Sequence, residues 1–496
     1  LRLMKLKIKK LKFLAGKPVC MIHELTASKL SLHVGNRISI ENKKGKKIIS
    51  IVDTIMGIIS KNEIAVSEDI IKELNLKDKE IVDIKIISKP YSINLIKKKL
   101  EGHRLNKQEI REIIENIANN SLTEVEIAFF VSAVYVRGMS LEETRNLIKA
   151  MVEVGNKLNL NGKIYDKHSI GGVAGNRTTP IVVSICAAAG LKIPKTSSRA
   201  ITSAAGTADV IETIAKVDFS INEIKKIIKK TNACFVWGGF LGLAPTDDEI
   251  IKVEHIVNID SIPQLLASIL SKKISIGSKY ILIDIPYGDC AKVSKKQAEK
   301  LKTAFLNLAE KFDLKLEVVL TDGSGPIGNG IGPLLEMQDI IKVLSRKNPP
   351  KDLEEKSVFL AGKLLELAGK KQCQKLAQEI LNSGLAFQKF KEIIKAQKGN
   401  INNLNRLKPK FFYNIKIKEK RKIKHIDNEL INKLARIAGC PEDKAAGIYI
   451  HKKKNETTEK NQPILTIYTI SKEKLNYAKK FYKENKREIV EFYWFD

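Results

Sequence analysis

The stretch KYILIDIPYG at residues 279–288 decides the fold class, because it is a mostly apolar run that ends in a turn glycine. ACFVWGG at 233–239 and KLEVVLTDGSG at 315–325 have the same character, which predicts buried strands. TPIVVSICAAAG at 179–190 fits either a strand or a helix. Since these runs alternate with helical segments, the sequence predicts an α/β sheet domain over residues 166–345.

The segments on either side have different periods. Residues 1–88 alternate short apolar runs with polar turns, which predicts a β-rich, barrel-like N-terminal domain. Residues 91–165 carry apolar side chains at helical spacing and predict a helical bundle domain, to which 247–273 returns. Residues 346–409 predict a helical extension of the α/β domain, and 410–496 mix strands with short helices. We therefore expect a multidomain α/β protein that ends in an α+β domain.

The composition is that of a globular protein, with 43% hydrophobic and 29% charged residues. No apolar run reaches the roughly 18–20 residues of a membrane span, and the lysine-rich start is not typical of a signal peptide. The six cysteines form no CxxC pair and the seven histidines no HxxxH pair. We therefore expect a cytoplasmic protein with no membrane partner, no disulfide framework, no cofactor and no protein-bound metal.

The formal net charge of +31 raises the question of nucleic acid. Only 13 of the 87 basic residues are arginine, and the lysines are spread along the whole chain without interleaved aromatic residues. This pattern favours a lysine-rich proteome or an adaptation to heat or salt, so we expect no nucleic-acid partner. The charge would still steer anionic substrates toward the protein.

Two loops predict phosphate binding. The first, KHSIGGVAGNRTTP at 167–180, is a glycine-rich turn before a predicted helix. Glycines let backbone N–H groups approach an anion closely, and a helix N-terminus adds partial positive charge. Lys167 adds a full charge, Ser169 adds a hydroxyl donor, and Gly172 belongs to the turn.

The second loop lies in KTSSRAITSAAGTADVIE at 195–212, where small hydroxyl residues surround one arginine. A guanidinium binds phosphate in a fork geometry, so the loop fits an oxyanion, although a polar loop rich in Ser/Thr turns fits equally well in isolation. Two such loops at strand ends of one α/β domain favour the anion. The candidate residues are Ser198, Arg199, Ala200, Ile201, Thr202, Ser203 and Thr207.

Three further residues are ambiguous by themselves. Asp260 comes just before Ser-Ile-Pro, a helix-start signature, and an N-cap is the usual explanation for such an aspartate. Ser268 lies on the helix that follows. Lys292, in GDCAKV at 288–293, follows a predicted strand and turn, where a lone lysine is normally only solvated.

The order and separation of these motifs resemble the thymidine phosphorylase family, and most of all its archaeal branch. The shared motifs are KHSxGGV, SSRAITSxAGTAD, VEHxxxIDxxxQLLASxxxKK, GxxAKV, TDGSGPIGNGIGP at 321–333 and, in the tail, AGxPxDKxAG within 434–450. The resemblance covers essentially the whole chain, including the β-rich N-terminal domain that typical bacterial members lack. It implies a homo-oligomer, a dimer or larger.

The resemblance implies reversible phosphorolysis, in which phosphate attacks C1′ of a nucleotide as the bond to the base breaks. Lys167, Ser169 and Thr207 are then expected to hold inorganic phosphate, the co-substrate. Gly172, the residues 198–203, Thr207, Ser268 and Lys292 are expected to contact the nucleotide. Asp260 is expected to act as the general acid that protonates the leaving base.

Two departures from the nucleoside-cleaving members bear on the substrate. SRAITSAAGT at 198–207 replaces their glycine-rich GRGLGHTGGT and adds donors suited to a 5′-phosphate. Val253 stands where they place an arginine for pyrimidine carbonyls. The departures predict AMP as substrate, giving adenine and ribose 1,5-bisphosphate, and do not exclude CMP and UMP. The alternatives are a pyrimidine nucleoside phosphorylase, a nucleic-acid-binding protein, and a phosphoribosyltransferase, for which Asp209 and Glu212 are the nearest candidate magnesium ligands.

Overall fold

The structure is a computed structural model that describes residues 3–200, 203–257 and 259–493. The chain divides into two compact units, one made of residues 1–155 with 244–268 and the other of 156–243 with 269–496. Among the described residues, no helix is both long and apolar enough to cross a bilayer.

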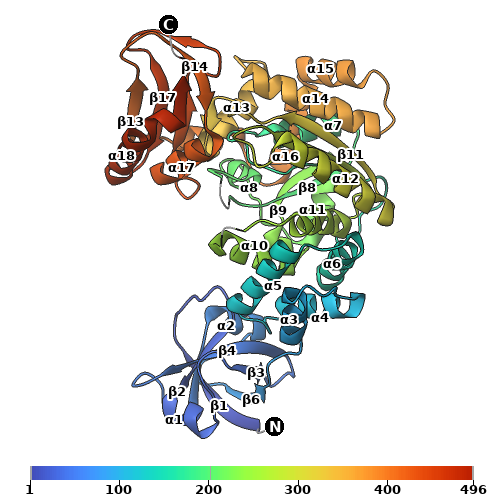
Figure 1. Ribbon diagram of the computed structural model, residues 1–496, viewed down its shortest axis with the longest axis vertical. Helices are drawn as coiled ribbons and strands as arrows, with labels where there is room; N and C mark the ends of the chain where they lie inside the picture. Colours follow the sequence, from blue (N-terminus) through green and yellow to red (C-terminus); the bar gives the residue numbers. More distant parts are fainter. Residues whose placement is uncertain (1–2, 201–202, 258, 494–496) are drawn as a thin grey trace. The chain divides into compact units, whose positions relative to one another are not determined.

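The first unit begins with a closed six-stranded barrel, drawn in blue in Figure 1. The strand order is β1-β5-β2-β4-β3-β6, and β1 pairs with β6 to close the ring. Leu6 and Ile8 of β1 are buried, as strand alternation requires for side chains that point into the barrel. The elements are β1 Leu3–Lys10, β2 Val19–His23, α1 Glu24–Lys29, β3 Arg37–Glu41, β4 Lys47–Ile55, β5 Glu63–Val66, α2 Glu68–Leu74 and β6 Ile81–Ile87.

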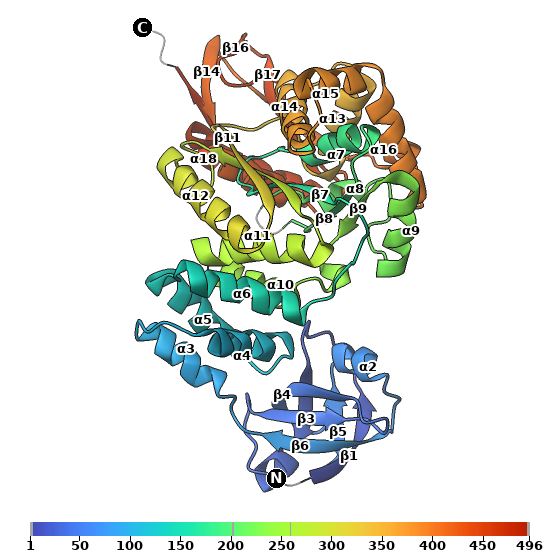
Figure 2. The same ribbon diagram turned by 90° about the vertical axis from the view of Figure 1, so that its right-hand side faces the viewer.

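A helical bundle completes the first unit, and Figure 2 shows its helices stacked in layers. Its helices are α3 Ser92–Leu100, α4 Lys107–Ala118, α5 Glu124–Arg137, α6 Leu141–Val154 and α10 Pro245–Val257. The later helix α10 packs against α4, α5 and α6. Ser140 and Glu143 form a capping box at the start of α6, and Glu143 also pairs with the buried Lys99 at 2.7 Å.

The second unit is built on parallel strands. One sheet has the order β11-β10-β7 and a second pairs β8 with β9, and a parallel bridge between Ile164 and Lys192 brings them edge to edge. The stretch at 279–288 is the central strand β10, buried along its whole middle. The strands are β7 Tyr165–Ser169, β8 Ile193–Ser197, β9 Ala233–Trp237, β10 Tyr280–Tyr287 and β11 Lys315–Asp322.

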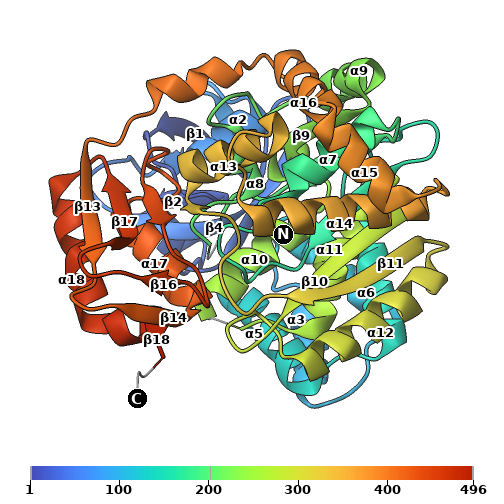
Figure 3. The same ribbon diagram turned by 90° about the horizontal axis from the view of Figure 1, so that it is seen from above.

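Helices cover both faces of this sheet, as Figure 3 shows for α12 and α14 beside β10 and β11. The ambiguous run at 179–190 forms the helix α7, and it is buried on every side, so it has no polar face to reveal its period. The helices are α7 Thr178–Ala188, α8 Thr207–Ile211, α9 Ile221–Thr231, α11 Ile262–Ile276, α12 Lys295–Lys311, α13 Pro333–Ser345, α14 Lys351–Leu367, α15 Cys373–Asn382 and α16 Leu385–Ala396.

The C-terminal part, red in Figure 1, is an α+β domain with its own hydrophobic core. One sheet has the order β12-β15-β17-β13 and another β16-β14-β18. The elements are β12 Gly330–Ile331, β13 Phe411–Lys416, β14 Arg421–Ile426, α17 Asn428–Ala438, β15 Gly447–Ile450, β16 Thr457–Thr458, β17 Pro463–Thr469, α18 Lys472–Ile489 and β18 Val490–Phe492. The barrel, the bundle, the α/β domain and this domain confirm the predicted fold class.

Candidate active site

The two loops predicted to bind anions, and the loop that carries Lys292, follow the carboxyl ends of parallel strands in the second unit. The glycine-rich loop 170–177 follows β7, the loop 198–206 follows β8, and the loop 288–293 follows β10. In a parallel α/β sheet, ligands bind beyond the carboxyl ends of the strands. The two loops predicted from the sequence therefore lie on the functional side of the sheet.

Lys167 is the buried cation of this site. Its side chain is fully buried, and its ammonium donates to the hydroxyl of Thr178 at 2.8 Å, at the first residue of α7. Burial lowers the pKa of Lys167 to about 8, although the nearby carboxylate of Asp284 opposes the shift. Asp284 is also 3.4 Å from the ammonium of Lys356. Lys167 thus places a positive charge beside a helix N-terminus, which is an arrangement suited to an anion.

The opposite face of β7 carries a second buried charge cluster. Asp166 is fully buried and lies 3.0 Å from the ammonium of Lys195 on β8 and 2.6 Å from that of Lys273 on α11. Although burial alone would raise the pKa of Asp166, the two lysines hold it below its usual range. The cluster thus connects α11 to β7 and β8, the two strands that the predicted phosphate loops follow.

Replacing Asp166 with asparagine is expected to lower the free energy of unfolding of the second unit by about 3–5 kcal/mol, because two buried ammonium groups lose their carboxylate. Urea unfolding followed by tryptophan fluorescence would measure this change, since Trp237 lies on β9 of the same unit. The control is Glu419→Gln, whose 70% exposed side chain pairs with Arg421. Equal midpoints for the two variants would contradict a stabilising role for Asp166.

The glycine-rich loop packs closely on the loop that carries Lys292. A Cβ on Gly172 would lie 2.7 Å from the backbone nitrogen of Lys292, and Gly172 has a φ of +88°, so a larger residue is excluded on both grounds. Gly172 and Lys292 are exposed, and Ser169 is partly buried and lies 3.5 Å from the amide of Asn176. The structure therefore brings together Gly172 and Lys292, two of the residues expected to contact the nucleotide.

Arg177 connects the two loops, although the sequence analysis did not single it out. Its guanidinium donates to the hydroxyl of Thr207 at 3.1 Å and to the carbonyl of Ala205 at 2.7 Å. Its Nε lies 2.5 Å from a carboxylate oxygen of the buried Glu336. An arginine directly after a glycine-rich loop and before a helix was the signal that could have identified it.

Arg199 is surrounded by carboxylates. It makes two 2.7 Å bonds to Glu212 and one of 3.3 Å to Asp209, and its guanidinium lies 4.7 Å from the ring centroid of Trp237. Hydrogen bonds from Arg199 lower the pKa of Glu212 to about 2. Lys444, from the AGxPxDKxAG motif, also binds Glu212 at 2.7 Å. Both acids named as candidate magnesium ligands are therefore already paired with cations.

Asp209 holds the loop 198–206, which carries the remaining candidate site residues, through two backbone hydrogen bonds. One of its oxygens accepts from the backbone nitrogens of Ala200 at 2.7 Å and Gly206 at 2.8 Å, and so pins both ends of the loop. Ser203 donates to the carbonyl of Ala205, and Ser198 is exposed. The predicted contacts Ile201 and Thr202 lie outside the described residues.

Asp260 and Ser268 belong to the first unit. Asp260 is exposed. The hydroxyl of the next residue, Ser261, accepts from the backbone nitrogen of Gln264, which is the hydrogen bond that an N-cap of α11 makes. Ser268 donates to Asp247 at 2.8 Å. Ser261 therefore acts as an N-cap at the start of α11.

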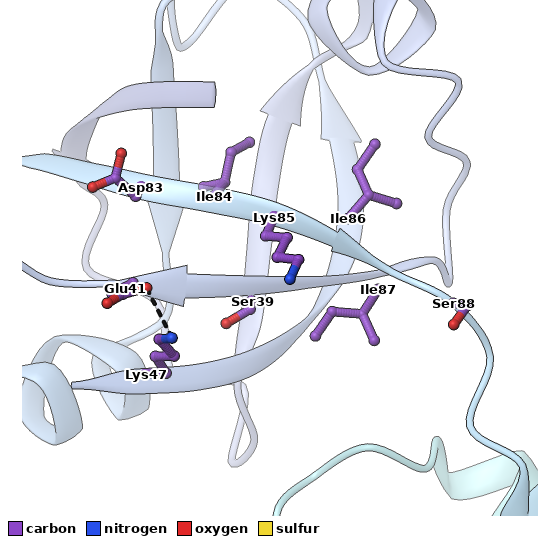
Figure 4. A pocket seen from close by; sticks show the side chains of 9 residues that line it. All are labelled: Ser39, Glu41, Lys47, Asp83, Ile84, Lys85, Ile86, Ile87 and Ser88. Atoms are coloured by element: carbon purple, nitrogen blue, oxygen red, sulfur yellow. Dashed lines mark ion pairs between the residues drawn. The ribbon is translucent and has the colours of Figure 1, made fainter. Parts of the chain in front are cut away.

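A surface hollow of about 410 Å³ lies elsewhere, on the barrel. Figure 4 shows its lining side chains on β3, β4 and β6, including the ion pair of Glu41 with Lys47 at 3.2 Å. None of the predicted site residues lines it. It is a groove between strands, unrelated to the phosphate loops.

These features define a class of protein: a helical bundle joined to a parallel α/β domain whose strand-end loops carry the residues expected to bind anions. Residues 93–155 match the helical bundle domain of the glycosyl transferase family, and residues 161–387 match its a/b domain. Residues 422–487 match the C-terminal domain of pyrimidine nucleoside phosphorylases. The α/β fold is also similar to anthranilate phosphoribosyltransferase from Thermus thermophilus, with a TM-score of 0.52, 18% identity, and 61% of this chain and 99% of that chain covered.

Curated relatives resolve the family further. The chain is 44% identical to the AMP phosphorylase of Methanocaldococcus jannaschii, over 88% of each chain. It is 42% identical to those of Thermococcus kodakarensis, over 96% of this chain and 95% of the relative, and Pyrococcus furiosus, over 95% of each. The chain therefore belongs to the AMP phosphorylase family of glycosyl transferases, which confirms the resemblance seen in its motifs.

Proposed function

We propose that this protein catalyses the phosphorolysis of AMP, producing adenine and ribose 1,5-bisphosphate. The observation that carries the proposal is the near-full-length identity of about 40% to several AMP phosphorylases. The loops after β7 and β8 support it, because a reaction between two phosphate-bearing substrates needs two anion sites.

Inorganic phosphate would bind at Lys167, Ser169 and Thr207. The buried ammonium of Lys167 supplies charge, and Arg177 supports this site by holding Thr207 through a 3.1 Å bond. Arg177 is then a positioning residue, since its own carboxylate partner Glu336 fixes its orientation. A phosphate oxygen attacks C1′ as the bond from C1′ to the base nitrogen breaks. The electron pair of that bond goes to the base, and Asp260 delivers a proton to it.

The nucleotide would bind at the loop 198–203, which Asp209 holds through the backbone nitrogens of Ala200, within it, and Gly206, just after it. Ser198 and Ser203, with Thr202 from outside the described residues, provide hydroxyl donors for the 5′-phosphate. Ala200 and Ile201 complete this loop, and Gly172, Ser268 and Lys292 are the further proposed nucleotide contacts. A site built around a substrate phosphate rejects the analogue that lacks it, because its donors are then left unpaired.

A base-release assay tests the proposal. With phosphate present, we expect the protein to release adenine from AMP much faster than thymine from thymidine or uracil from uridine. CMP and UMP, tested in parallel, define the preference for the base. A preference for any nucleoside over its own 5′-monophosphate would refute the assignment of the loop 198–203 and favour a pyrimidine nucleoside phosphorylase.

Replacing Arg199 with alanine is expected to raise the KM for AMP by about tenfold or more and to change that for adenosine far less. A charge-assisted bond is worth about 1.5–3 kcal/mol, and 1.4 kcal/mol is tenfold in affinity. This role requires Arg199 to exchange a bond to Glu212 for one to the 5′-phosphate. Steady-state kinetics with both substrates would measure the difference, with Lys444→Ala as the control that also removes a cation from Glu212. Equal effects of Arg199→Ala on both substrates would make Arg199 a structural partner of Glu212 only.

A phosphoribosyltransferase, which the sequence also allows, has less support. A phosphoribosyltransferase would need acids for magnesium, yet Asp209 and Glu212 are paired with Arg199 and Lys444. The fold likeness to such an enzyme, at 18% identity, concerns the architecture alone. We further propose that the enzyme is homo-oligomeric. We also propose that it is cytoplasmic, because its six cysteines are free.

A further inference from the structure

The fold brings together three metal-ligating side chains that lie outside the predicted phosphate and nucleotide contacts. Cys290 lies in the loop after β10, His425 lies on β14, and Asp427 is the N-cap of α17. One ligand atom from each of the three lies within 4.8 Å of the others. The sequence has no CxxC or HxxxH spacing that would indicate this cluster, because its residues come from distant segments of the chain.

We propose that Cys290, His425 and Asp427 bind a divalent transition-metal ion of the zinc class. A sulfur, a nitrogen and an oxygen ligand are the set that tetrahedral zinc accepts, and a water molecule would complete the fourth position. The proposal does not depend on the reaction assigned to the loops, because none of the three residues is a proposed substrate contact.

The local charge favours a cation, even though the whole chain carries a net charge of +31. The Cys290 thiol hydrogen-bonds to Asp427, and the carboxylates of Asp427, Asp289 and Glu491 all act on it electrostatically. Three carboxylates thus create a negative potential at this sulfur. Glu491 forms an ion pair with Lys424 at 3.1 Å. Asp427 and Asp289 are therefore the main source of this negative potential.

The ligands are also positioned for an ion. Nε2 of His425 is buried and has no hydrogen-bond partner among the described residues. One oxygen of Asp427 accepts from the backbone nitrogen of Leu430 at 2.7 Å, and the carboxylate also accepts from the Cys290 thiol, whose proton an ion would replace. The buried Asn428 donates to the carbonyl of Cys290 at 3.0 Å, which holds the Cys290 loop against the start of α17.

A nucleophilic cysteine is the competing interpretation of a Cys, His and Asp group. It does not fit, because a nucleophilic thiol hydrogen-bonds to the base that takes its proton. Here the thiol hydrogen-bonds to Asp427, and Nε2 of His425 has no hydrogen-bond partner among the described residues. Metal binding instead replaces the thiol proton by the ion and releases that proton to solvent. The bound ion would join the loop 288–293, which packs on Gly172, to β14 and α17.

Cobalt titration tests this site directly. The full chain, stripped of metal with a chelator that is then removed, is titrated with Co²⁺ and followed by absorption spectroscopy. We expect one Co²⁺ per chain, with the charge-transfer band of a thiolate ligand and the strong visible bands of tetrahedral coordination. The band should vanish in Cys290→Ser and remain in Cys373→Ser, a matched control because Cys373 is also partly exposed.

Zinc affinity supplies the second measurement. Asp427→Asn keeps a good N-cap for α17 but removes the charge, so it should fold normally. We expect Asp427→Asn and His425→Gln each to weaken Zn²⁺ binding by at least about tenfold, the effect of losing even an outer-shell partner. Zn²⁺ should also raise the Tm of the wild type more than that of either variant. A thiolate band that is missing in the wild type, or that survives Cys290→Ser, would overturn the proposal, as would unchanged zinc affinity in Asp427→Asn.

Discussion

Replacing Lys167 with methionine is expected to raise the KM for inorganic phosphate by about ten- to a hundredfold and to leave the KM for AMP nearly unchanged. The ammonium would make charge-assisted bonds worth about 1.5–3 kcal/mol to the phosphate, and each 1.4 kcal/mol is a factor of ten. Methionine is an unbranched side chain of similar length, so it fills the same buried space. The measurement is the phosphate dependence of adenine release at saturating AMP.

The variant should remain folded, which separates binding from stability. Asp284, whose carboxylate raises the pKa of Lys167, keeps its ion pair with Lys356 at 3.4 Å and a hydrogen bond from Thr321 at 2.5 Å. Lys315→Met is the control, because it removes an exposed lysine at the opposite, amino-terminal end of β11. An unchanged phosphate KM in a folded Lys167→Met protein would remove this lysine from the phosphate site.

The pH dependence provides an internal check on the same residue. Burial lowers the pKa of Lys167 to about 8, so the ammonium is lost as the pH rises through that value. The kcat/KM for phosphate, which reports the free enzyme, should therefore fall above about pH 8. Bound phosphate favours the charged lysine, so the corresponding fall in kcat should lie at higher pH. The Lys167→Met variant should lose this alkaline limb, and its survival there would assign the limb to another group.

The central strands could be predicted from the sequence because a strand that is buried on both faces is apolar at most of its positions. β10 is buried along its whole middle, and the turn residues at its ends mark where the chain reaches solvent. α7 could not be assigned in the same way. All its residues except the last are buried, so neither a helical nor a strand period is visible in TPIVVSICAAAG.

The chemistry of the loops was predictable, but the partners of their charges were not. A loop of small hydroxyls around Arg199 indicates an anion, yet the structure shows Glu212 and Asp209 on that arginine. Those acids follow in the same stretch, and only the turn of α8 brings them back onto the loop. Lys444 reaches Glu212 from a domain more than 200 residues later, which no local spacing can reveal.

The largest expected effect belongs to Asp260→Asn, which should lower the kcat for AMP by about 10²–10⁴ and leave the KM for AMP nearly unchanged. General acid catalysis by a positioned side chain contributes about that factor, and asparagine has no proton to deliver. The substitution is nearly isosteric. Because the N-cap role at the start of α11 falls to Ser261, the fold should be kept. Steady-state kinetics of adenine release would measure both constants.

The identity of the leaving group tests the role itself. A nitrophenyl ribofuranoside 5-phosphate releases a stable anion that needs no proton, so Asp260→Asn should cleave it at nearly the wild-type rate. A residue that only binds or orients the ribose would slow both substrates equally. The matched control is Glu249→Gln, which removes a carboxylate of the same unit that pairs with Lys252 at 2.6 Å and should affect neither substrate. Equal losses on AMP and on the nitrophenyl substrate would therefore leave Asp260 a positioning residue, and the proton for adenine would have to come from another group.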